Sequence, residues 1–210
     1  VIPFDPNWDG HESMSGFWFF DDATACEPSR ELINFLEDGR PPIAISFSSM
    51  PLKKPHDVKE MLEKALALTG QRGIFITGWS GMDVQETKNH IFAVNAIPHS
   101  WLFPRTSGVI HHGGAGTTAA VLKAGKPMII CPFSGDQPFW AKRMHELQLS
   151  TAPLKEKDMT VETFVARIKE LVHHEELNAN ALAVSERIKQ EKGIEETVDI
   201  IERRINEYKR

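Results

Sequence analysis

A glycine-rich stretch from His111 to Thr117, with the sequence HHGGAGT, constrains this chain more than any other feature. It follows an apolar run that ends at Ile110 and precedes a helix-forming run from Thr118 to Ala124. Glycines at positions 113, 114 and 116 let the backbone approach a ligand closely. The N-terminus of the following helix supplies free N–H groups and the positive end of its dipole. The stretch therefore predicts a strand–loop–helix junction that holds a diphosphate.

Two other interpretations of this loop remain open. Gly114-x-Gly116-x-x-Ala119 also fits the dinucleotide fingerprint, and Asp136 follows at about the 20-residue distance expected of a ribose-binding acid. That fingerprint, however, belongs to the first strand–helix turn of a domain, and several strand candidates come earlier here. Asp136 also lies in a Gly-Asp-Gln-Pro turn. A nicotinamide or flavin site is one alternative, and a glycine-rich turn without a ligand is the other.

Short apolar runs alternate with helical patterns along the chain. The expected strands are 42–48, 73–77, 91–94, 109–110 and 128–130, with a short one at 150–154. The expected helices are 29–37, 53–69 and a helical tail over 160–210 that breaks near 178–180 and at Gly193. This order predicts an α/β fold, a Rossmann-like parallel sheet with helices on both faces.

Ligands of such sheets bind at the carboxyl ends of the strands. The side chains that follow the predicted strands should therefore line one edge of the sheet. They are Ser49, Trp79, His99, the loop from His112 to Gly116, and the pair Asp136 and Gln137.

Composition places bounds on the partners. A chain of 210 residues, 41% hydrophobic and 25% charged, suits one α/β domain, and a net charge of −5 offers no basic face for nucleic acid. Cys26 and Cys131 lack metal-ligand spacing and form no disulfide framework, so we expect a cytoplasmic location. No apolar run approaches the ~20 residues that span a bilayer. Any membrane association is expected to come from regions outside this chain.

Two segments beside the loop extend the pattern into a family resemblance. They are NAIPHSWLFP at 95–104 and PMIICPFSGDQPFW at 127–140. Together with the loop, they resemble the donor-binding C-terminal half of GT-B glycosyltransferases, in particular the sterol glucosyltransferase and antibiotic glycosyltransferase branch. Asn7-Trp8 and the stretch from Gly16 to Phe19 resemble the interdomain linker of the sterol-type enzymes.

The resemblance implies a division of the chain and of the whole enzyme. Residues 1–28 would be the linker, 29–192 the nucleotide-sugar domain, and 193–210 a helix that packs toward an N-terminal domain. That domain, which this chain does not match, would hold the acceptor and the general base. We therefore expect the chain to be a fragment or excised domain, inactive by itself.

The resemblance also assigns roles to residues. The diphosphate would be bound by Ser49, His112, Gly114, Gly116 and Thr117, the sugar by Asp136 and Gln137, and the base and ribose by Ile97, His99 and Trp79. The alternatives are a buried structural His112, a solvated Asp136 in a plain turn, and a core position for Trp79.

No metal or cofactor is expected at this site. A metal would usually be held by paired carboxylates, and Asp21-Asp22 lies far from the loop in the linker-like sequence. Fixed dipoles of the loop and helix can stabilise the leaving diphosphate instead. His111 and His112 should point to opposite faces of a strand, so joint chelation by the two is not expected.

The sequence thus predicts the donor-binding domain of an inverting, metal-independent glycosyltransferase. The expected donor is UDP-glucose, and the expected acceptor is a sterol or similar lipophilic alcohol that reaches the site through the N-terminal domain. One alternative is a TDP-sugar-dependent natural-product glycosyltransferase. The other is a non-catalytic nucleotide-binding module.

Overall fold

The computed structural model describes residues 1–9, 12–19, 27–47, 53–78 and 90–208. Within these ranges the centre of the molecule is a five-stranded sheet in the order β3-β2-β1-β4-β5, and every strand pair is parallel. The strands are β1 (Ile43–Ser46), β2 (Gly73–Ile76), β3 (Ile91–Val94), β4 (Gly108–His111) and β5 (Met128–Ile130). The predicted α/β fold with a parallel sheet is confirmed.

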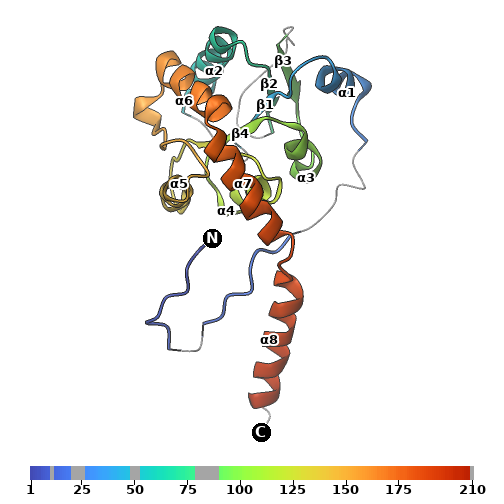
Figure 1. Cartoon of the computed structure of the whole chain (residues 1–210), viewed down its shortest axis with the longest axis vertical. Helices are drawn as coiled ribbons and strands as arrows, with labels where there is room; N and C mark the ends of the chain where they lie inside the picture. Colours follow the sequence, from blue (N-terminus) through green and yellow to red (C-terminus); the bar gives the residue numbers. More distant parts are fainter. Residues whose placement is uncertain (10–11, 20–26, 48–52, 79–89, 209–210) are drawn as a thin grey trace.

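Helices cover both faces of the sheet (Figure 1). One face packs on α2 (Pro55–Thr69) and α6 (Val161–His173), and Ile43, Ile45 and Ile110 point to that side. The other face packs on α1 (Arg30–Glu37), α3 (His99–Leu102), α4 (Ala115–Lys123), α5 (Gln137–Glu146) and α7 (Glu175–Ile188). Strands that are buried on both faces explain why they appear in the sequence as continuous apolar runs.

Local signals in the sequence set the helix ends. The Ser29 hydroxyl accepts the Leu32 N–H at 3.2 Å and caps α1, while Gly70, with φ of 64°, ends α2 in the left-handed conformation. Helix α4 begins at Ala115, three residues before the predicted start at Thr118. The first turn of α4 therefore lies inside the glycine-rich stretch.

The strand order places a topological switch point between β1 and β4. The chain builds β1, β2 and β3 toward one edge and then returns to β4 on the other side of β1. At the carboxyl end of this pair, Ser46 of β1 lies opposite His111 of β4. Open α/β sheets bind their ligands at such a point.

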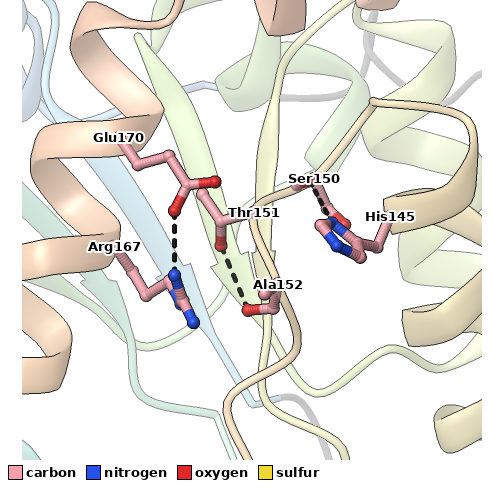
Figure 2. Close-up of polar contacts among 6 residues, drawn as sticks. All are labelled: His145, Ser150, Thr151, Ala152, Arg167 and Glu170. Carbon is pink, nitrogen blue, oxygen red and sulfur yellow. Dashed lines mark hydrogen bonds and ion pairs between the residues drawn. The ribbon is translucent and has the colours of Figure 1, made fainter.

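The strand expected at 150–154 does not form. This segment makes a single β-bridge, Ser150 with Met128, and Pro153 has no N–H to continue a ladder. The Ser150 carbonyl oxygen lies 3.3 Å from His145 Nδ1, and the Thr151 hydroxyl donates to the Ala152 carbonyl (Figure 2). The prediction of a short sixth strand is therefore wrong.

The predicted break near 178–180 is also wrong. Helix α7 runs without interruption through Asn178 and Asn180, and the tail bends earlier, at His174, with ψ of 95°. The Asn180 amide donates to the Gln148 carbonyl at 3.2 Å, so its side chain bonds to a neighbouring segment and leaves the α7 backbone bonds intact. The break before Gly193 is confirmed, because α7 ends at Ile188 and α8 (Gly193–Tyr208) begins there.

The N-terminal segment and α8 meet at the border of the domain. Helix α8 extends away from the sheet, and the segment before residue 20 runs past its start (Figure 1). The Ser15 hydroxyl accepts a hydrogen bond from Thr197 at 2.6 Å, and the Phe17 N–H donates to Glu191 at 3.2 Å. Among the described residues no helix is long and apolar enough to cross a bilayer. The proposed boundaries at 28 and 192 stay predictions.

Candidate functional site

The first turn of α4 presents backbone donors at the switch point. The Thr118 N–H makes the first helical bond, to the Gly114 carbonyl at 2.9 Å. The N–H groups of Ala115, Gly116 and Thr117 precede that bond and have no acceptor within the helix, and the N-cap Gly114 has no side chain to cap them. This turn can therefore donate to an anion.

The surroundings of each glycine in the loop explain why a residue without a side chain stands there. Gly113 has φ of 92°, and a Cβ there would meet the Ile130 side chain at 2.6 Å and the Gln137 carbonyl at 3.3 Å. A Cβ on Gly114 would lie 2.5 Å from His112 Nε2, whereas one on Gly116 would meet no atom within 4 Å. Packing inside the protein explains the first two glycines. The third faces open space, where a ligand can approach the backbone.

His111 holds the loop in place, a role that the sequence did not reveal. It is fully buried at the end of β4, and its Nδ1 accepts the Gly113 N–H at 3.1 Å. The Gly113 N–H is thereby occupied within the protein. The signal in the sequence is the position of His111 at the end of an apolar run, since every side chain of β4 is buried and Val109, on the same face as His111, belongs to the core.

His112 follows His111 directly after β4. The residue is 8% exposed, and its Nδ1 is buried without a hydrogen-bond partner among the described residues. Burial lowers the pKa of His112, while the backbone of Ser46 and the carboxylate of Asp136 act in the opposite direction. His112 is therefore a neutral side chain beside an acid, and its ring carries a buried polar nitrogen that no described residue satisfies.

The neighbouring histidines are also held neutral. Burial lowers the pKa of His111 to about 3, and repulsion from His112 and His99 adds to the effect. Burial lowers the pKa of His99 to about 4, and His112 contributes again. His99 begins α3 and stacks on Phe103 with ring centroids 4.4 Å apart. His99 lies close enough to His111 and His112 for their charges to affect one another's pKa, which places it beside the glycine-rich loop. Its contact with base or ribose stays a prediction.

Asp136 and Gln137 lie at the N-terminus of α5, and Gln137 packs against Gly113 of the glycine-rich loop. Asp136 is exposed, and its Oδ2 accepts the Trp140 indole N–H at 2.9 Å. Gln137 is buried, and its Oε1 accepts the N–H groups of Phe133 at 2.8 Å and Ser134 at 3.1 Å. The Gln137 amide oxygen therefore fixes the turn, so toward a sugar this side chain can act only as a donor.

The remaining predicted residues are placed only in part. Ile97 is half-buried and packs against the core cluster on the α3 and α4 side of the sheet. Ser49 and Trp79 lie outside the described residues. In the described part of the chain, no group of three or more histidine, cysteine, aspartate or glutamate residues is arranged to hold a metal ion.

Residues 59–203 match the family described as erythromycin biosynthesis protein CIII-like, C-terminal domain. A sterol 3-beta-glucosyltransferase of Arabidopsis thaliana is 37% identical over 195 residues, which are 92% of this chain and 30% of that protein. The O-mycaminosyltylonolide 6-deoxyallosyltransferase of Streptomyces fradiae is 32% identical over 206 residues, which are 96% of this chain and 47% of that enzyme.

The solved structure of a calicheamicin glycosyltransferase superposes with a TM-score of 0.70 at 17% identity and covers 80% of this chain and 44% of that structure. This likeness supports the fold, which is that of one half of a GT-B glycosyltransferase. The chain spans less than half the length of each of these relatives. It belongs to the family of erythromycin biosynthesis protein CIII-like C-terminal domains, the donor-binding domains of glycosyltransferases.

Proposed function

We propose that this chain binds the UDP-glucose donor of an inverting glycosyltransferase that transfers glucose to a sterol or similar lipophilic alcohol. One observation carries the proposal: the N-termini of α4 and α5 meet at the switch point of the sheet, with His112 beside Asp136. The N-terminus of α4 can hold a diphosphate. The N-terminus of α5 can hold a hexose, since the Asp136 carboxylate accepts from sugar hydroxyls and the Gln137 amide N–H donates to them.

The diphosphate would lie on the first turn of α4. The N–H groups of Gly116 and Thr117 and the imidazole of His112 would donate to its oxygens, and Ser49, which follows β1 in the sequence, would add a hydroxyl. A dianion beside His112 favours the charged imidazolium and raises its pKa. Donors fixed in this way stabilise the charge that develops on the leaving nucleoside diphosphate without a metal ion.

The sterol acceptor is proposed from the Arabidopsis relative, whose name states that activity. The general base is proposed to lie in the part of such a protein that this chain does not span. It would deprotonate the acceptor hydroxyl for direct displacement at the anomeric carbon, which inverts the configuration. The same part is proposed to cover α8, whose Ile194, Val198, Ile201 and Ile205 form an apolar stripe and are each 47–51% exposed.

A second candidate keeps the site and changes the substrates. By its name, the Streptomyces relative transfers a 6-deoxyallosyl group to O-mycaminosyltylonolide, and for this second candidate we propose a TDP-sugar donor and a natural-product acceptor. Base recognition separates the two candidates, because the diphosphate contacts are common to both.

Calorimetric titration of this chain with UDP-glucose, UDP, TDP and NAD, each with and without EDTA, tests the proposal. We expect saturable binding of UDP-glucose and UDP that EDTA does not change, with TDP weaker. Tighter binding of TDP would select the second candidate. Binding of NAD alone would contradict both.

A further inference from the structure

Trp140 occupies an unusual position for a core tryptophan. It belongs to α5, is 7% exposed, and packs with the apolar cluster between α5 and the sheet. Its indole N–H nevertheless points back along the helix to Asp136 Oδ2, at 2.9 Å. A buried indole N–H usually has a hydrogen-bond partner, because an unpaired one would destabilise the fold. Here that partner is the carboxylate proposed to bind the sugar.

The bond has a consequence for the carboxylate. Asp136 is exposed at the helix terminus, where the side chain of an aspartate would otherwise rotate freely. With Oδ2 held by a buried ring, the rotation of the carboxylate is restrained, and Oδ1, which accepts no hydrogen bond from the described residues, can accept from a ligand. The backbone adds to this constraint, since the Trp140 N–H donates to the Asp136 carbonyl at 3.1 Å.

The outer side of the Trp140 ring is supported by the N-terminal segment. Phe17 lies with its ring centroid 6.2 Å from that of Trp140, and Phe19 lies 5.9 Å from Phe17. The backbone of this segment is held at the junction of α7 and α8. A Cβ on Gly193 would meet the Phe17 carbonyl at 2.4 Å, so only glycine allows the close approach at that point.

We propose that Trp140 is a positioning residue for donor recognition: it orients the Asp136 carboxylate toward the sugar, and Phe17 of the linker-like segment holds Trp140 in place. The proposal rests on the proposed function, because it takes Asp136 as the sugar-binding carboxylate. It links the segment before the domain to hexose recognition through two side-chain contacts. Trp140 itself acts only through Asp136.

The contribution of the sugar to affinity measures this role. We compare the dissociation constants of UDP-glucose and UDP for wild type and Trp140→Phe, which keeps a ring in the core and removes the N–H. The variant should weaken UDP-glucose binding by about fivefold to tenfold and leave UDP binding unchanged, as expected for a lost hydrogen bond that orients a charged group. Trp18→Phe is the matched control, because Trp18 is 64% exposed and its indole N–H donates to Ser15 instead.

A double-mutant cycle tests the route through Asp136. In an Asp136→Ala background, Trp140→Phe should have no further effect on UDP-glucose binding. Phe17→Ala should reduce the UDP-glucose affinity in the same selective way. Thermal unfolding of each variant checks that the domain is folded at the titration temperature.

The outcomes are distinguishable. Equal loss of UDP and UDP-glucose affinity in Trp140→Phe, or an undiminished effect in the Asp136→Ala background, would overturn the positioning role while the donor site stands. Wild-type protein that binds neither ligand would refute the proposed function and the positioning role with it.

Discussion

Replacing Gly116 by alanine should separate ligand binding from folding. Gly116 lies in the first turn of α4, and a Cβ added there meets no protein atom within 4 Å. The substitution therefore creates no clash in the free protein. In the proposed complex, however, the same space is occupied by a phosphate oxygen that bonds the backbone N–H.

The two effects have opposite signs. Alanine is favoured over glycine in a helix by up to about 1 kcal/mol, which raises the melting temperature by about 2–4 °C for a domain of this size. A displaced diphosphate loses a hydrogen bond to a charged group, about 1.5–3 kcal/mol, or roughly 10- to 100-fold in the dissociation constant of UDP.

Calorimetric titration with UDP and thermal unfolding of the free protein measure both quantities. Asn206→Ala is the matched control, because it places alanine at an exposed position of α8, remote from the site. This control should leave UDP affinity unchanged. It should shift the melting temperature by no more than about a degree or two. A Gly116→Ala variant that binds UDP as tightly as wild type would refute the placement of the diphosphate on this turn.

Three further predictions follow from the site and the core. His112→Ala should weaken UDP binding about tenfold or more in calorimetry, since a donor to a charged group is lost; unchanged affinity would favour a purely structural histidine. The free energy of unfolding, followed in urea, should fall as the pH drops from 7 to 5. Burial holds the folded-state pKa of His99 at about 4 and that of His111 at about 3. As the pH falls, the unfolded chain therefore takes up protons on these rings before the folded chain does. Each ring then lowers the free energy of unfolding by about 1.4 kcal/mol per pH unit. His111→Gln should flatten this slope, and a flat wild-type profile would contradict the buried neutral cluster. In a Cys26→Ser variant, Cys131 should resist thiol reagents until the protein unfolds, because it is fully buried and burial raises its pKa; fast labelling of native protein would contradict this placement.

The sheet could be predicted from the sequence because buried parallel strands leave continuous apolar runs. The predicted strands 91–94 and 128–130 have the same first and last residues as β3 and β5. The expected strand at 150–154 differs because Pro153 prevents a ladder, although Ser150 still bridges to β5. The expected break at 178–180 differs because the Asn180 amide bonds to the Gln148 carbonyl, a contact that local propensity does not encode.

The site could be predicted in outline but not in its hydrogen bonds. Spacing and resemblance brought together His99, His112 and Asp136, and the structure places them around one edge. The roles of His111 and Trp140 depend on side-chain directions in the folded protein, since each bonds a group within a few residues through a buried ring. The same holds for Gln137, whose amide oxygen closes its own turn.

Backbone amide shifts of the ¹⁵N-labelled chain during titration with UDP-glucose test the central claim most directly. The predicted result is saturable shifts that are largest at Gly114, Ala115, Gly116 and Thr117, with a second group at Asp136 and Gln137. Saturating ligand that leaves these amides unchanged, or that shifts only residues at the opposite end of the sheet, would contradict the proposed donor site.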